Sequence, residues 1–178
     1  QISTRGEENS TSSGAWGAFA RAVEVAAQVL GHTSALQALR GIQFVHAVTL
    51  IAELGDLTRF ASARALMGYL GLVPRENSSG EHRRQGAITK AGNSYARRAL
   101  IEAAWAYRHP ARVTRIIATR QAGLPKAACD IAWRAQLRLS SKYRRLAARH
   151  LNHNKIVVAL ARELSGFVWA IGQCVKPQ

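Results

Sequence analysis

Apolar residues recur at three- and four-residue steps along most of this chain, which is the spacing of one face of an α-helix. Small and polar residues interrupt the pattern, and glycine or proline stands at most interruptions. The helical segments predicted from this spacing cover residues 15–31, 33–40, 43–54, 62–70, 94–109, 111–121, 126–150 and 154–174. No stretch clearly shows the alternation of apolar and polar residues that is typical of a β-strand.

Three of these segments carry apolar positions that we expect to face a core. In 15–31 they are Trp16, Phe19, Val23, Ala26, Ala27 and Leu30, and in 62–70 they are Ala65, Leu66, Tyr69 and Leu70. In 154–174 they are Ile156, Val157, Leu160, Leu164, Phe167, Val168 and Ile171. The last segment is strongly apolar, so we predict that it is the most buried helix, and that Gly166 allows close contact with another helix.

Local signals mark several helix ends. Gly31 and Gly55 are predicted to end the helices that precede them, because glycine adopts the backbone conformation that follows a helix. Ser62 and Asn93 are predicted N-caps, because their side chains can accept from the first free backbone N–H groups. Pro110 is predicted to end the helix before it.

These segments predict an all-α fold, a compact bundle of about seven helices that forms one domain over 15–178. Residues 1–14 are polar and have no apolar period, so we predict a disordered N-terminal tail. The order helix, Gly41, helix between residues 33 and 54 has the outline of a helix-hairpin-helix. Such a motif offers backbone N–H groups at a helix start to a phosphate.

The segment 71–93, "GLVPRENSSGEHRRQGAITKAGN", is predicted to be a long, exposed Ser/Gly/Arg loop. A short hairpin around Gly80–Gly86 is an alternative within it. Loops of this length without structure are uncommon and are often functional.

The charge of the chain narrows the class of partner. Among 178 residues there are 25 Lys and Arg against 10 Asp and Glu, a net charge of +15. This excess favours a polyanion, most often nucleic acid, with an anionic membrane surface as the alternative. No stretch comes close to the length of apolar chain that spans a membrane. Cys129 and Cys174 lack metal-ligand spacing and are expected to be free thiols.

The positive charge is concentrated between residues 108 and 150, where Asp130 is the only acid. Four of the basic residues recur at three- and four-residue steps and form one helical stripe: Arg134, Arg138, Lys142 and Arg145. A stripe with so little interspersed acid favours phosphate contact over a merely solvated face. Trp133 and Tyr143 in the same region either pack in the core or stack on bases.

The loop offers chemistry that suits a phosphodiester. Ser78 and Ser79 stand beside Gly80, which permits close approach of a ligand. Arg83 and Arg84 follow, and guanidinium groups bind phosphate and stabilise developing charge. An exposed serine can attack such a group when a base activates it. The alternative is a flexible Ser/Gly loop without chemistry.

The chain resembles the C-terminal region of insertion-sequence transposases of the IS110/IS116/IS902 family. The resemblance rests on "AELGD" followed by "RF", then "YLGLVP", "SSG", "GAITKAGN" and "RRALIEAAW", in this order and closely spaced. The later "LAARHLNHNKIVVALARELSGFVWAI" also fits. The resemblance covers roughly residues 37–174 and does not include residues 1–36.

The resemblance implies a role in DNA recombination. The family joins an RNase H-like domain, whose carboxylates bind Mg²⁺, to a helical domain whose serine attacks DNA. That serine corresponds to Ser79, with Ser78 as the second choice. The resemblance also implies a guiding RNA, in the best understood branch, and a homo-oligomer. The predicted nucleic-acid-binding residues in and after the loop are Arg83, Arg84, Lys90, Asn93, Arg97 and Arg98.

The carboxylate domain is not found in these residues, and we expect no metal or other cofactor in this chain by itself. Glu53 and Asp56 are close in sequence but are expected to be solvated at a helix end. We therefore expect a DNA-binding transposase domain of the bacterial cytoplasm, associated with the nucleoid, that does not recombine DNA alone. The alternative is a non-catalytic nucleic-acid-binding remnant, and no membrane association is expected.

Overall fold

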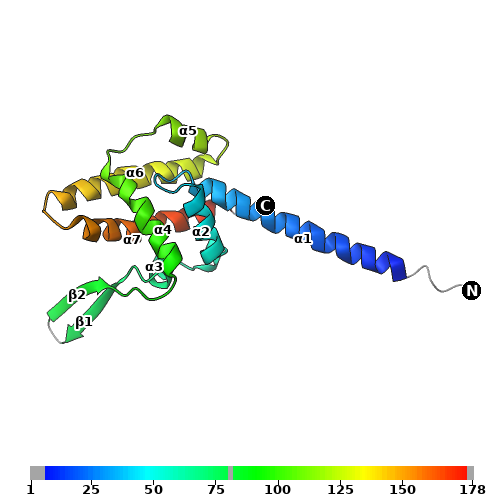
Figure 1. Cartoon of the computed structure of the whole chain (residues 1–178), viewed down its shortest axis with the longest axis horizontal. Helices are drawn as coiled ribbons and strands as arrows, with labels where there is room; N and C mark the ends of the chain where they lie inside the picture. Colours follow the sequence, from blue (N-terminus) through cyan, green and yellow to red (C-terminus); the bar gives the residue numbers. More distant parts are fainter. Residues whose placement is uncertain (1–6, 80–81, 176–178) are drawn as a thin grey trace, which may run out of the picture.

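The computed structural model describes the backbone of residues 7–79 and 82–175, and the side chains of residues 22–75 and 86–175. Seven α-helices and one small antiparallel sheet make up the described part (Figure 1). The helices are α1 (Glu7–Leu36), α2 (Phe44–Leu54), α3 (Ala63–Tyr69), α4 (Ser94–Ala104), α5 (Arg115–Gln121), α6 (Lys126–Ala147) and α7 (His153–Cys174). The strands are β1 (Pro74–Ser79) and β2 (His82–Ile88). The predicted all-α helical bundle is confirmed, with this small sheet added.

The core is built around α7, which contacts α3, α4 and α6. The prediction that α7 is the most buried helix is supported by the almost complete burial of Ile156, Val157, Leu160, Leu164, Val168 and Ile171. Phe167 is only partly buried. Gly166 packs against α3, where an added Cβ would lie 3.3 Å from Met67 Cε. The predicted close helix contact at this glycine is therefore confirmed.

Length and mean hydropathy alone would allow α7 to cross a membrane, which differs from the prediction that no stretch comes close to doing so. Half of its most apolar window is buried inside the protein. The apolar composition therefore has a simpler physical cause: α7 is the central helix, and α3, α4 and α6 cover it.

The N-terminal helix α1 differs from its prediction. It continues through Gly31 to Leu36, because a single glycine within a helix weakens it without ending it. It begins at Glu7, so it includes part of the segment predicted to be a disordered tail, and residues 1–6 lie outside the described residues. Much of α1 extends away from the bundle (Figure 1). Val23 and Leu30, predicted to face the core, are 52% and 62% exposed, and Ala26 and Ala27 are also exposed.

The predicted caps at Ser62 and Asn93 and the predicted helix end at Gly55 are confirmed. Ser62 Oγ accepts from Ala65 N at 3.2 Å at the start of α3, and Asn93 Oδ1 accepts from Ala96 N at 2.9 Å at the start of α4. Gly55 follows α2 with a φ of 63°. The prediction of which α3 residues face the core was only partly correct.

On α3, Leu66 and Leu70 are buried, whereas Ala65 and Tyr69 are exposed. Tyr69 instead lies at the surface against Phe60, with the Arg59 guanidinium 5.1 Å from the centre of its ring. The segment before Pro110 ends in a 3-10 turn, Trp105–Arg108, after α4. The helix predicted over 111–121 begins only at Arg115.

The segment 71–93, predicted to be a long loop, contains a β-hairpin. The prediction of a loop without strands was therefore wrong, and the alternative of a short hairpin was closer to the structure. Strands β1 and β2 pair antiparallel, and their hairpin extends from the helical body (Figure 1). Two backbone hydrogen bonds close its base, from Thr89 N to Val73 O at 2.9 Å and from Lys90 N to Gly71 O at 3.1 Å. Gly71 has a φ of 63°, and an added Cβ would lie 2.0 Å from the Ala91 carbonyl oxygen.

Candidate nucleic-acid interface

The two candidate nucleophiles lie on β1 near its end. In the hairpin register, Ser78 is opposite Arg83 and Ser79 is opposite His82, while Asn77 is opposite Arg84. The hairpin therefore brings the predicted serine and arginine segments onto adjacent strands. The side chains of Ser78, Ser79, Arg83 and Arg84 lie outside the described residues, so their roles stay predictions.

The predicted contacts beyond the hairpin begin at its base. Lys90 is exposed and has a φ of 57°. Asn93 caps α4 and donates through Nδ2 to the Glu53 carboxylate. Arg97 donates from Nη1 to the carbonyl oxygens of Leu70, at 2.9 Å, and Ala91, at 3.1 Å. Arg97 and Asn93 thus hold the segments that flank the hairpin, and their predicted contact with phosphate stays a prediction.

Arg98 is exposed, like Lys90. Its Nε donates to Glu102 at 2.8 Å, one helical turn further along α4, and its side chain is 80% exposed. The hydrogen bond from Arg98 holds the pKa of the Glu102 carboxyl below its usual range. A phosphate that binds Arg98 therefore has to compete with this carboxylate.

The predicted stripe lies on one helix, α6, which packs beside α7 (Figure 1). Arg134 and Arg145 are exposed, and neither has a carboxylate partner among the described residues. Arg138 is 68% exposed, whereas the Lys142 side chain is only 20% exposed. The stripe is therefore not uniform, because its two middle members point toward α7.

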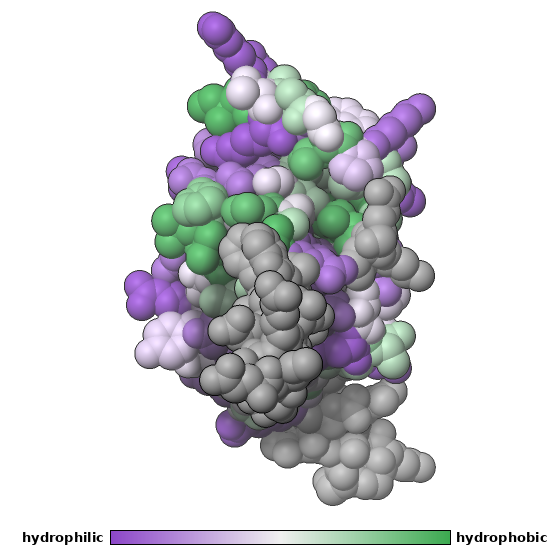
Figure 2. Space-filling model, turned by 90° about the vertical axis from the view of Figure 1, so that its right-hand side faces the viewer, coloured by the Kyte–Doolittle hydropathy of each residue, from purple (hydrophilic) through white to green (hydrophobic). Residues whose placement is uncertain are grey.

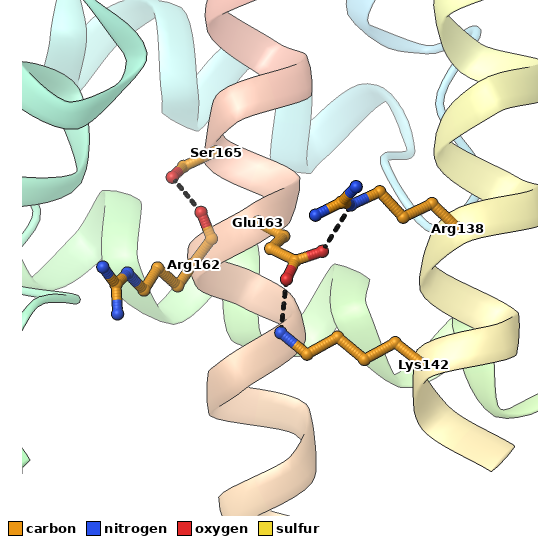
Figure 3. A network of polar contacts seen from close by, with 5 residues as sticks. All are labelled: Arg138, Lys142, Arg162, Glu163 and Ser165. Carbon is orange, nitrogen blue, oxygen red and sulfur yellow. Dashed lines mark hydrogen bonds and ion pairs between the residues drawn. The ribbon is translucent and has the colours of Figure 1, made fainter. Parts of the chain in front are cut away.

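Glu163 of α7 is the partner of these two cations (Figure 3). Its Oε2 accepts from Arg138 Nε at 2.9 Å, and its Oε1 accepts from Lys142 Nζ. Burial raises the pKa of the Glu163 carboxyl, but the two hydrogen bonds outweigh burial, so the pKa lies below its usual value. Glu163 is consequently charged at neutral pH and neutralises part of the stripe.

A cleft lies between the base of the hairpin and α7, and it was not predicted from the sequence. Its volume is about 1030 Å³. The lining comes from α3, both strands, α6 and α7, and its charged members are Lys142, Lys155, Arg162 and Glu163. Lys155 and Arg162 are seven residues apart on α7, which is a helical spacing that could have drawn attention to them. In the sequence these two residues stand among many apolar ones, so they were not recognised as a basic face of α7.

The other predicted contacts are less favourable. In the turn of the helix-hairpin-helix outline, Gly41 packs closely against Ala103, because an added Cβ would lie 2.1 Å from the Ala103 carbonyl oxygen. Gln43, Phe44 and Val45 at the start of α2 are exposed, so the turn is only partly covered. Tyr143 stacks on His153 and is partly buried, whereas Trp133 is 40% exposed. Of the two aromatic residues near the stripe, Trp133 is thus the more accessible to a base.

The described residues do not fit a Mg²⁺ site. Four carboxylates already accept from protein donors: Glu53 from Asn93, Asp56 from Thr58, Glu102 from Arg98, and Glu163 from Arg138 and Lys142. Among the side chains that the structure describes, those of residues 22–75 and 86–175, there is no group of three or more His, Cys, Asp or Glu residues that could hold a metal ion. Any Mg²⁺ chemistry of the kind that the resemblance implies needs ligands other than these.

The fold and this surface together define a mostly helical, strongly basic domain with a serine-bearing hairpin. Residues 33–117 match the family described as Transposase IS116/IS110/IS902 family. This region of the chain therefore belongs to that transposase family, as the motifs in the hairpin and its flanks implied.

Three relatives illustrate the similarity. A Sinorhizobium fredii protein named as a transposase, y4qE, is 49% identical over 139 residues, which are 78% of this chain and 36% of the relative. The transposase for insertion sequence element IS1111A of Coxiella burnetii is 36% identical over 39% of this chain and 19% of its own length. The transposase for IS1533 of Leptospira borgpetersenii is 29% identical over 62% of this chain. This chain thus spans about a third or less of the relatives that it matches.

Proposed function

We propose that this chain is a DNA-binding domain of an insertion-sequence transposase. The observation that carries the proposal is the basic surface of α6, with Arg134, Arg138 and Arg145 exposed on one helix. A surface of this kind gains affinity for DNA by displacing the counterions that surround the phosphates. The family match supports DNA as the polyanion.

The binding proposal is tested by measuring the affinity of the chain for a short DNA duplex by fluorescence anisotropy. Arg134→Ala combined with Arg145→Ala removes two stripe cations that have no described carboxylate partner. We expect at least a tenfold loss of affinity, since each phosphate contact contributes to the counterion-release term. Arg64→Ala, at an exposed arginine on α3 outside the predicted set, is the matched control. Equal losses in the double variant and the control would contradict the proposal.

We further propose that Ser79 is the residue that attacks DNA in the complete recombinase, with Ser78 as the second choice. The support is the family match and the hairpin register, which puts these serines on the strand beside Arg83 and His82. A serine hydroxyl needs a base or a metal to activate it, and the described carboxylates do not supply a metal site. The 178-residue chain alone should therefore bind DNA without forming a covalent product.

Intact-mass analysis of the chain after incubation with junction DNA and Mg²⁺ tests this second step. No DNA adduct is expected from this chain alone. An adduct that disappears in Ser79→Ala would show that the chain is self-sufficient. An adduct that survives in Ser79→Ala but disappears in Ser78→Ala would assign the reaction to the other serine.

Two further parts of the proposal concern partners. Exposed apolar residues accumulate on α1, and this supports a homo-oligomer in the complete protein, because larger exposed apolar patches often mark interaction sites; they are Val23, Val25, Val29 and Leu30. We also propose a guiding RNA and a cytoplasmic, nucleoid-associated location, and the support for both is the resemblance to the family alone. The alternative, a binding module without chemistry, shares the interface and differs only in the role of Ser79.

A further inference from the structure

The cleft beside the hairpin combines two kinds of surface. Its apolar part includes Met67, Leu72, Ile88 and Val158, which come from three different parts of the chain. The volume of about 1030 Å³ lies at the upper end of pockets that accept small organic ligands. A cleft of this size and composition is suited to a flat, largely apolar group that carries a negative charge.

One face of α7 forms a wall of the cleft. Lys155, Val158, Ala159 and Arg162 follow the i, i+3, i+4, i+7 spacing of a single helix face, and all four line the cleft. Arg162 is half-buried, and in Figure 3 its side chain extends to the opposite side of α7 from Arg138. Neither Lys155 nor Arg162 has a carboxylate partner among the described residues.

The charge of the lining is positive. Among the described residues of the lining, Glu163 is the only acid, and Arg138 and Lys142 of α6 already engage both of its oxygens. This leaves Lys155 and Arg162 available for an anion at the cleft. Pro74, Ala87 and Ile88 of the hairpin form the other side, so the anion would lie at the base of the strands that carry Ser78 and Ser79.

We propose that this cleft binds one unpaired nucleotide of the DNA, with its base against Met67, Ile88 and Val158 and its phosphate on Arg162 and Lys155. The inference rests on the proposed function, since it assigns a place to part of the DNA. The aliphatic wall has no groups to read the edge of a base, but it can cover the face of one. That face is accessible only when the nucleotide leaves the stack, so paired DNA cannot fill the cleft.

The test compares a short DNA duplex with the same duplex carrying one extra, bulged 2-aminopurine nucleotide. We expect the 178-residue chain to bind the bulged duplex about tenfold more tightly, and the fluorescence of the 2-aminopurine to change on binding. Ala159→Leu fills the cleft while keeping its cations, and Arg162→Ala removes the proposed phosphate ligand. Both should reduce the ratio of the two affinities to about one. Arg162→Lys should recover part of the preference for the bulged duplex.

Arg145→Ala is the control, because it lies on the stripe and does not line the cleft. It should weaken both complexes equally and keep their ratio. Thermal unfolding by circular dichroism confirms that each variant is folded. Equal binding of the two DNAs by the unchanged chain, or a ratio that survives in both cleft variants, would overturn the inference while duplex binding still stands. Failure to bind either DNA would instead reject the proposed function itself.

Discussion

Glu163 on α7 and Arg138 on α6 are joined across the helix pair, with Glu163 Oε2 2.9 Å from Arg138 Nε. The same carboxylate also accepts from Lys142, so one acid holds two of the four stripe cations. The contact links the packing of the two longest core helices to the charge of the proposed interface. A single substitution at Glu163 should therefore affect both stability and DNA binding.

Glu163→Gln should raise the affinity of the chain for duplex DNA by about threefold to tenfold at low salt, corresponding to about 0.6–1.4 kcal/mol. The substitution removes a negative charge beside the stripe and releases Arg138 for phosphate. Fluorescence anisotropy measures the effect. Glu24→Gln makes the same change of charge at an exposed site on α1, and it should have a much smaller effect. A loss of affinity in Glu163→Gln would show that the carboxylate positions the cations rather than masking them.

The ion pair should also make stability depend on pH in the acid range. Because the pKa of Glu163 is lower in the folded protein, its carboxylate stabilises the fold at pH values above the usual value of 4.5. This contribution should be lost as the pH falls from 4.5 through the lowered pKa, when the folded protein takes up the proton. Urea unfolding at several pH values should show Glu163→Gln less stable than the unchanged chain at pH 7. The gap should close in acid, and a constant gap would contradict the linkage.

Gly172 is predicted to be essential for packing in α7. An added Cβ would lie 2.5 Å from Leu57 Cβ, so Gly172→Ala should lower the free energy of unfolding by about 1–3 kcal/mol through overpacking. Gly68 on α3 is the matched control, since nothing lies within 4 Å of an added Cβ there. Gly68→Ala should raise stability by about 0.5–1 kcal/mol, because alanine is the better helix former. Chemical denaturation that shows equal effects for both would contradict the packing account.

Asn93 has two roles that two substitutions can separate. Asn93→Ala removes the cap of α4 and the bond to Glu53, and should lower the free energy of unfolding by about 1–2 kcal/mol. Asn93→Asp keeps an acceptor for the Ala96 N–H but places a second carboxylate against Glu53. We expect Asn93→Asp to recover stability when the pH is lowered enough to protonate one carboxyl. Equal stability of Asn93→Asp at neutral and acid pH would show that the contact with Glu53 contributes little to the free energy of unfolding.

The features that could be predicted from the sequence were those set by neighbouring residues. The caps at Ser62 and Asn93 and the buried face of α7 follow from local spacing. The exposure of Val23 could not be predicted, because helical spacing identifies an apolar face without saying what covers it. Apart from Pro74 and the Gly86, Ala87 and Ile88 positions at the base of the hairpin, the strands PRENSS and HRRQGAI are polar at every position, so they carry no alternation that would have marked the hairpin.

The candidate site was predictable only in part for a related reason. The stripe on α6 lies within one helix and was visible as a spacing of charges. The partner of its middle members, Glu163, is 25 residues from Arg138, and only the packing of α6 on α7 brings them together. The cleft likewise needs Ile88, Lys142 and Arg162 to meet from three elements, which no local pattern records.

The most direct test of the central claim, that this domain binds DNA through phosphate contacts on α6, is the salt dependence of duplex binding. If the three exposed stripe cations, Arg134, Arg138 and Arg145, each contact a phosphate, the slope of log affinity against log salt should be about −2.7. Replacing Arg134 and Arg145 by alanine should make the slope shallower by about 1.8. A slope near zero for the unchanged chain, or the same slope for both proteins, would contradict the account.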